Sequence, residues 1–302
     1  MSTLPDLRVG DPVRHEVLAV FPLFSAPDGQ VDYLLSDEAI GAGSVTVEEV
    51  SEGGSVPNLL VTNQGDSRVL FLEGEELRGA KQNRVLNTSV LIAAHSKTPI
   101  PVSCVEQGRW RYRSRHFVSG GSHSSSKLRH ILKKSAYRSM KAGHGYTSDQ
   151  MGVWNEVTRQ MDSLGSSSET AAMADTYETY QGRLAEFRES LKYVEGASGL
   201  AVAVGTKVVA LDLFDKPSTC AKVWDRLLSG VVMDALEEGS ADQVAQRADV
   251  EGLLARLREC AWEPAPAVGE GQEFRYDADP ETHASALVCG GSMLHGSVAV
   301  AN

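Results

Sequence analysis

The hydrophobic periodicity of the chain changes near residue 118, and this change constrains the fold more than any other feature. Before it, short apolar or β-branched runs alternate with turn-forming residues, as is typical of strands. After it, apolar residues recur at the spacings of three and four that are typical of helices. Two later alternating runs, 200–204 and 207–214, surround Gly205-Thr206 and predict a β-hairpin. The pattern predicts an α+β protein with a β-rich N-terminal third, residues 13–118.

The most regular helical pattern lies between residues 148 and 196. Apolar side chains there follow one another at spacings of 4-3-4-3-4-3, at Met173, Tyr177, Tyr180, Leu184, Phe187, Leu191 and Val194. Together with an apolar stripe in 149–164, this seam predicts a central antiparallel helical hairpin. The apolar side chains of this seam can pack against other parts of the same chain, which we favour, or against a second copy of the chain.

We expect residues 1–302 to form a single α+β domain with no clean internal boundary. Its expected sub-regions are the β-rich part 13–118, a basic Ser/Gly-rich loop and helix at 119–147, the helical hairpin at 148–196, and an α+β part at 197–302. The C-terminal β-hairpin and helices are expected to pack on the same sheet as the early strands. Gly269-Glu270-Gly271 predicts the start of a loose polar connection.

The charge of the chain is unevenly distributed. The 29 Lys and Arg against 40 Asp and Glu leave a net charge of −11, which makes general nucleic-acid binding unlikely. Yet residues 107–148 hold ten Lys or Arg and no Asp or Glu. The ten cations lie within residues 109–141, which we call the basic segment. The segment can close over an anionic ligand as a lid, dock on carboxylates of the same chain, or be disordered, and the sequence does not decide among these three possibilities. The Ser/Gly-rich stretch 119–126 has the composition of a mobile loop.

The sequence lacks the features that several classes of protein require. No apolar run is long enough to span a membrane, and the N-terminus has no basic region followed by an apolar stretch, so a cytoplasmic location is expected. The four cysteines are far apart, which predicts no dedicated zinc or disulfide framework. The phosphate-loop, dinucleotide-binding, HExxH and GxSxG motifs are missing.

A first polar cluster occupies residues 73–84 (EGEELRGAKQNR) and follows a strand-like run. It is too polar for a core strand, and its glycines allow sharp turns or close approach to a ligand. Glu73 and Glu75 are expected on one face of an extended strand. Such carboxylates, near Lys81, Gln82 and Arg84, can hold a metal–phosphate group or supply a general base. A charged surface turn is the alternative.

A second cluster ends another predicted strand at Glu106-Gln107-Gly108-Arg109-Trp110. A carboxylate, an amide, a guanidinium and an aromatic ring within five residues suit a nucleotide-like ligand. Trp110 can stack on a base, Arg109 can bind a phosphate, and Glu106 can accept from a ribose hydroxyl. Cys104, on the same strand, is expected to be a small buried side chain and not a nucleophile.

At these two clusters the chain resembles a known family, the ADP-ribosylglycohydrolase and rhodanese-phosphatase-superfamily-associated protein domain. The matching stretches are 72–84 (LEGEELRGAKQNR) and 101–110 (PVSCVEQGRW), and the later stretch 199–214 looks similar too. The resemblance covers about residues 15–240. By association alone it implies a link to ADP-ribose or related phosphoester metabolism, and it transfers no catalytic residue.

Two functions follow as hypotheses. In the first, the protein binds or processes a phosphorylated nucleotide or ADP-ribose-like small molecule through a Glu/Arg/Gln pocket. Its catalytic residues would be Glu75 and Glu106, and its ligand-binding residues Glu73, Lys81, Gln82, Arg84, Gln107, Arg109 and Trp110. The sequence leaves open whether the protein is an enzyme and whether it needs a cofactor, a divalent metal included. In the alternative, the protein is a non-enzymatic interaction module that self-associates or binds a protein through helices at 149–194.

Overall fold

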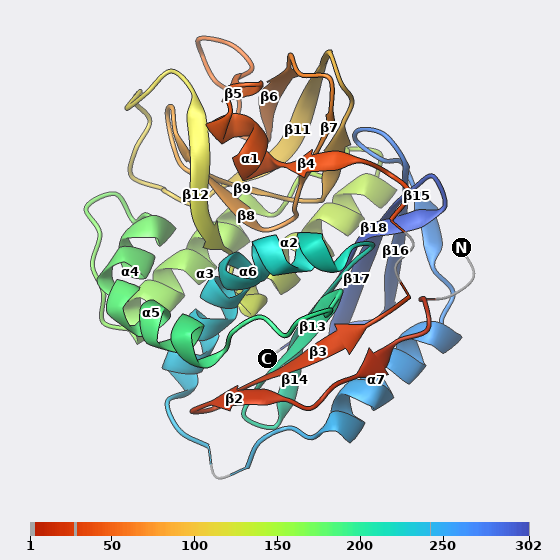
Figure 1. The fold of residues 1–302 in the computed structure, drawn as a ribbon. Helices are drawn as coiled ribbons and strands as arrows, with labels where there is room; N and C mark the ends of the chain where they lie inside the picture. The colour runs from red at the N-terminus through yellow and green to blue at the C-terminus, as the bar shows by residue number, and fades with distance from the viewer. Residues whose placement is uncertain (1–3, 27–28, 242, 302) are drawn as a thin grey trace.

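The computed structural model describes residues 4–26, 29–241 and 243–301 (Figure 1). These residues form a mixed α+β structure with antiparallel-rich sheets and long helices between them, which confirms the predicted fold class. Among the helices of this described part, none combines the length and the apolar character that crossing a bilayer requires.

The largest sheet joins both ends of the chain. The hairpin strands β13 and β14 lie between the early strand β3 and the last strand β18, with Val202 opposite Val20 and Leu211 opposite Val298. The prediction that the late hairpin packs on the same sheet as the early strands is therefore confirmed. The strands run β1 (Arg8–Val9), β3 (Leu18–Phe24), β13 (Gly199–Val204), β14 (Lys207–Phe214), β18 (Ser292–Val300), β17 (Thr282–Cys289), β16 (Gln272–Asp279) and β15 (Glu263–Ala265), with β2 (Val13–His15) paired to β3.

The other strands, all from residues 33–123, form two smaller sheets, which we together call the half-barrel. Alternate side chains of these strands, including Phe71, Leu77 and Phe117, fill a small apolar core of their own. One sheet has the order β12 (Phe117–His123), β8 (Glu75–Gly79), β9 (Arg84–Leu86), β11 (Ser96–Cys104), β6 (Asn58–Asn63) and β5 (Val45–Glu49), and the other has β10 (Val90–Ile92), β7 (Arg68–Phe71) and β4 (Tyr33–Leu35).

Two helices lie between the large sheet and the half-barrel (Figure 1). α2 packs on β17 and β18, and α6 packs on β12, β13 and β14. α7 covers the opposite face of the large sheet, where it closes a second apolar core. The helices are α1 (Ser36–Gly41), α2 (Ser126–Lys141), α3 (Gln150–Ser163), α4 (Met173–Thr179), α5 (Gln181–Ser190), α6 (Pro217–Glu238) and α7 (Arg247–Glu259).

The predicted seam at 173–194 is filled from within the chain. Tyr177, Leu184, Phe187 and Leu191 belong to the core that also contains Trp224 of α6, so the internal packing we favoured is confirmed. The seam is not one continuous helix, because it divides into α4 and α5 at Tyr180. The Tyr180 hydroxyl donates to the carbonyl of Leu164 and ties this break to the end of α3.

The expectation of a mobile loop at 119–126 is wrong. β12 continues to His123, and residues 122–126 are buried. Three tertiary hydrogen bonds hold this segment: the Ser122 hydroxyl donates to Glu76 at 2.5 Å, the Ser124 hydroxyl to the Gly74 carbonyl at 3.0 Å, and the Ser126 amide to Asp234 at 2.7 Å. Composition predicted flexibility, but these contacts fix the segment in place.

Gly230 of α6 allows the close approach of helix and half-barrel. A Cβ built there would lie 2.1 Å from the carbonyl oxygen of Ser124, whereas one at Gly252 of α7 meets nothing within 4 Å. We therefore expect Gly230→Ala to cost more than about 2 kcal/mol through overpacking. Gly252→Ala, its control, should stabilise by about 0.5–1 kcal/mol through helix propensity. Urea unfolding measures both, and equal midpoints for the two variants would contradict this packing.

Candidate functional site

The structure separates Glu73 from Glu75, so the prediction that they share a face of one strand is wrong. Gly74 has a φ of +81° and makes a turn, and β8 begins only at Glu75. Glu73 therefore points toward α2, where its Oε2 accepts from Lys133 Nζ at 2.7 Å. Glu75 points toward Ser36 of α1 and Arg226 of α6.

Glu73 belongs to a layer of buried charges between α2 and the large sheet, which we call the central charged layer. Lys133 also donates to Ser285 at 2.7 Å, and all three side chains are buried. Burial lowers the pKa of Lys133 to about 8 against the opposing attraction of Glu73. Burial alone would raise the pKa of Glu73, but Lys133, Arg275 and Arg129 together lower it. The pair is therefore held in its charged form.

Arg129, one turn before Lys133, makes the second contact of this layer. Its guanidinium binds both oxygens of Asp212 on β14, at 2.9 and 2.6 Å. Asp212 also contacts His295 Nε2 at 3.1 Å, and His295 Nδ1 lies 2.7 Å from the hydroxyl of Ser89. Burial would raise the pKa of Asp212, but Arg129 and His295 hold it well below its usual range.

This chain of hydroxyl, imidazole and carboxylate has the connectivity of a hydrolase relay, but its surroundings give it a structural role. Arg129 already compensates the charge of Asp212, so the carboxylate is not free to stabilise an imidazolium. The Ser89 hydroxyl also accepts from the Glu73 amide at 2.9 Å, and Ser89, His295 and Asp212 are all buried. The residue pattern did not reveal this layer, although Arg129 and Lys133 stand four residues apart on the helix face that carries Leu128 and Leu132.

The inner face of the basic segment is thus docked on carboxylates of the same chain, one of the three alternatives that the sequence left open. Removing one partner of such a pair leaves an uncompensated buried charge, which typically costs 3–5 kcal/mol.

We expect Asp212→Asn to destabilise the protein by about 3–5 kcal/mol because it strands Arg129. The pKa of Asp212 in the folded state lies below its value of about 3.9 in the unfolded state. Its contribution to the free energy of unfolding is therefore fully present above that pH and is lost as the pH falls. The variant should therefore lose less stability on acidification than the unchanged protein. Urea unfolding from pH 3 to 7 measures this. Asp66→Asn, at an exposed pair with His95, is the control and should change little.

Glu75 occupies a separate buried site. Its Oε2 accepts from the Ser36 hydroxyl at 3.0 Å and lies 3.6 Å from Arg226 Nη2, and Arg226 also lies 3.6 Å from Asp37. Burial raises the pKa of Glu75 to about 6, against the opposing effect of Arg226. A carboxyl group in this range can exchange a proton near neutral pH. Its side chain is nevertheless enclosed by α1, β8 and α6.

Glu106 and Arg109 form a closed ion pair. Arg109 donates to both Glu106 oxygens, at 2.7 and 2.6 Å, and to the Ala80 carbonyl at 2.6 Å. Glu106 also accepts from the Asn83 amide at 3.1 Å and from the Thr170 hydroxyl at 2.9 Å. These contacts occupy both groups and fix the turn between β8 and β9. Because neighbouring residues of a strand face opposite sides, it is Glu76, not Glu75, whose pKa responds to the charge of Glu106. The structure does not bring Glu75 and Glu106 together.

The remaining predicted residues do come together, beside the Glu106–Arg109 pair. Lys81 Nζ lies 5.3 Å from the ring centre of Trp110 and 5.1 Å from that of Tyr112. The fully buried Arg84 donates to Gln82 at 3.2 Å and lies 3.7 Å from Glu49, while Gln82 contacts the carbonyl of Gln107. Trp110 and Tyr112 are about half exposed, at 47% and 51%, which is unusual for such large rings.

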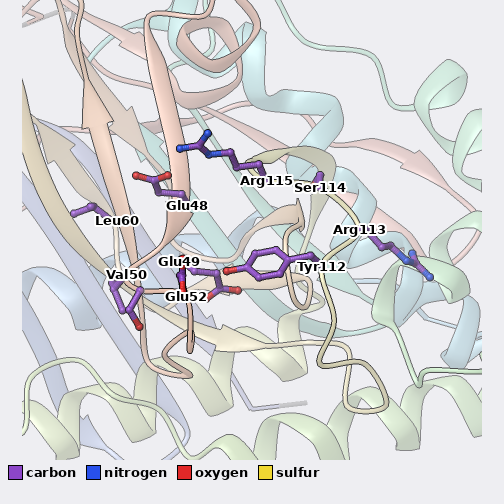
Figure 2. A pocket seen from close by; sticks show the side chains of 10 residues that line it. Glu48, Glu49, Val50, Glu52, Leu60, Tyr112, Arg113, Ser114 and Arg115 are labelled. Atoms are coloured by element: carbon purple, nitrogen blue, oxygen red, sulfur yellow. The ribbon is translucent and has the colours of Figure 1, made fainter.

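A cleft of about 860 Å³ opens next to this cluster, which we call the Tyr112 cleft (Figure 2). One wall is the end of β5 and the chain after it, with Glu48, Glu49 and Glu52, and the other is the loop Tyr112–Arg115. Tyr112 and Arg115 extend from this loop toward the carboxylates of β5, whereas Arg113 extends away from them (Figure 2). The sequence motif indicated Trp110, but it did not reveal Glu49, Tyr112 or Arg115.

Glu49 is the buried acidic group of this wall. It is 7% exposed, and within the described residues its Oε2 has no hydrogen-bond partner. Its other oxygen accepts weakly from the Lys81 amide, at 3.4 Å, and lies 3.7 Å from Arg84. A buried carboxylate oxygen without a donor is costly, and a ligand hydroxyl or a water would satisfy it. Across the described part of the chain, no three His, Cys, Asp or Glu side chains are grouped as a metal site would require.

Cys104 lies behind this cluster and is fully buried, as predicted. Burial raises the pKa of its thiol to about 11, against the attraction of Arg84. We expect Cys104 to remain unmodified when the folded protein is treated at pH 8 with a thiol reagent, because thiolate is the reactive form. The half-buried Cys260 and Cys289 are the internal controls and should react first. Peptide mapping checks the order, and rapid labelling of Cys104 would contradict this placement.

The fold and the cleft define an α+β domain protein with a polar, aromatic-edged surface cleft. The chain belongs to the ARG and Rhodanese-Phosphatase-superfamily-associated Protein domain family (ARPP-1), which it matches over residues 6–299. The resemblance seen in the two sequence clusters is thus confirmed over nearly the whole chain. Searches among curated proteins and among solved structures gave no match.

Proposed function

We propose that the Tyr112 cleft binds a phosphorylated nucleotide or ADP-ribose-like small molecule. The observation that carries this proposal is the pair of half-exposed rings, Trp110 and Tyr112, which both lie near the Lys81 ammonium, next to a cleft that holds both carboxylates and guanidinium groups. Aromatic rings at the edge of a polar cleft suit a nucleobase, because every base offers a flat face for stacking. The volume lies in the usual range for small-molecule sites.

The polar groups of the cleft suit the rest of such a ligand. Arg115 extends toward the cleft and can bind a phosphate group through two parallel hydrogen bonds. Glu49, with its unpartnered oxygen, can accept from a ribose hydroxyl. In this proposal the buried Arg84 supports Glu49 from behind, and the Glu106–Arg109 pair positions the loop that carries Trp110 and Tyr112. Arg109 also donates to the Arg111 carbonyl of this loop at 2.9 Å.

Binding is the core of this proposal, and turnover is a further step. Glu106 is occupied by Arg109, and Glu75 lies in a different buried site, so neither of the carboxylates predicted to be catalytic is placed to act on a ligand in the cleft. Glu48 and Glu52 line the cleft and are the carboxylates that can activate a water there. The alternative function, self-association through residues 149–194, would use the polar outer faces of those helices, because their apolar seam is buried inside the chain.

Isothermal titration with ADP-ribose, ADP, NAD and ribose 5-phosphate, each with and without Mg²⁺, tests the cleft. We expect Tyr112→Ala to weaken binding of the base-containing ligands by about 5- to 150-fold, since stacking on one ring is worth about 1–3 kcal/mol. Arg115→Gln should weaken the binding of all four ligands. Arg111→Gln, which removes an equal charge from the same loop but does not line the cleft, is the matched control.

The outcomes separate the alternatives. Binding that depends on Tyr112 and Arg115 but not on Arg111 supports the proposal, and product formation would then be followed for the bound ligand. Equal effects of the two arginine variants would indicate long-range charge alone. If none of the four ligands binds, the cleft does not recognise this class of molecule.

A further inference from the structure

The basic segment has a second, outer face that the central charged layer does not use. Six Lys and Arg side chains lie on α2, and four of them have carboxylate partners, since Lys127 pairs with Glu237, Arg129 with Asp212, Lys133 with Glu73 and Lys141 with Glu263. The other two are Lys134 and Arg138. Within the described residues neither makes an ion pair or a hydrogen bond.

Lys134 and Arg138 stand four residues apart, so they lie on the same face of α2. Like charges at this spacing repel each other and weaken the helix. In a chain with 40 Asp and Glu, carboxylates compensate the other four cations of this helix but not these two. Their shared position therefore creates local positive potential without an internal partner.

Both side chains line a groove of about 620 Å³ between the outer face of α2 and the start of α3, which we call the α2–α3 groove. His144, from the connection between the two helices, lines it too, and so does Ser139, whose hydroxyl makes no hydrogen bond in the described structure. Asp149 is the one acidic residue among those that line the groove. Its Oδ1 accepts from the Gly152 amide at 3.1 Å and so caps α3.

The nearby imidazoles respond to this positive potential. His130 and His283 pack 4.8 Å apart, ring centre to ring centre, on the side of α2 next to Lys134. Burial, and then the charge of Lys134, lowers the pKa of His130. Burial, His130 and the nearby cations, Lys134 and Arg138 among them, lower the pKa of His283 to about 3. Both imidazoles are therefore uncharged near neutral pH, and the positive charge remains on the groove.

We propose that the α2–α3 groove is a second ligand site, which binds a compact polyphosphate group through Lys134, Arg138 and the Ser139 hydroxyl. Cationic side chains on one helix face, a free hydroxyl and an imidazole from the opposite wall are the donors that phosphate oxygens require. The groove has the size of a small-molecule site. A nucleic acid would need a longer track of free cations, and the other four cations of α2 are already paired. This site is independent of the Tyr112 cleft.

Isothermal titration of the full chain with inorganic pyrophosphate tests the groove directly. We expect the double variant Lys134→Gln/Arg138→Gln to bind pyrophosphate at least tenfold more weakly than the unchanged protein. The matched control is Lys97→Gln/Lys207→Gln, which removes the same charge at two exposed lysines and should change the affinity less than twofold. Circular dichroism verifies that both variants are folded.

Three outcomes would overturn the proposal. Pyrophosphate fails to bind the full chain, or both double variants lose affinity equally, or a single-stranded oligonucleotide binds through Lys134 and Arg138 while pyrophosphate does not. The Lys134→Gln/Arg138→Gln variant should also bind ADP-ribose in the Tyr112 cleft with the affinity of the unchanged protein. A failure of the groove can thus be distinguished from a failure of the cleft.

Discussion

The contact between α2 and the large sheet is the constraint on which the rest of the structure depends. Arg129 and Lys133 project from the buried face of this helix onto Asp212 and Glu73, which come from the late hairpin and from the half-barrel. Paired buried charges are costly to separate, because each one left alone would have no solvent to compensate it. Since these two pairs connect a helix, the large sheet and the half-barrel, they set how the three parts meet.

This arrangement also decides where ligands can be recognised. Glu73, which the sequence placed in a binding site near Lys81, pairs instead with Lys133 and helps to hold the molecule together. The groups that remain available lie at the periphery, where Tyr112 and Arg115 border one cleft and Lys134 and Arg138 border another. Nine of the ten cations that looked like one basic segment therefore fall into three groups: buried structural partners, surface ion pairs, and free charges beside hollows of the surface. The tenth, Arg111, lines neither cleft.

Local periodicity was enough to predict the hairpin at 200–214, the helices within 149–194 and the β-rich first third. It failed where polar side chains have buried partners. The 119–126 stretch forms a strand and a helix start because its hydroxyls bind Glu76 and Gly74. The sequence predicted a loose polar connection where the structure has strand β16. The charged residues Glu273 and Arg275 suggested a loop, but in the strand they are buried and pair with each other. The candidate site was predicted in part: Trp110 and the cleft residue Tyr112 both lie near Lys81, but Glu75 and Glu106 face different environments.

The sequence by itself determined the class of fold, the family and the residues that carry unusual polarity, because spacing and composition act locally along the chain. It also indicated that the seam of 173–194 needed a partner. Only the tertiary structure decided which charges neutralise one another. The partners Glu73 and Lys133 are 60 residues apart and Arg129 and Asp212 are 83 apart. Whether a carboxylate serves a ligand or a buried cation depends on what the fold brings within about 3 Å of it, and no local pattern records that distance.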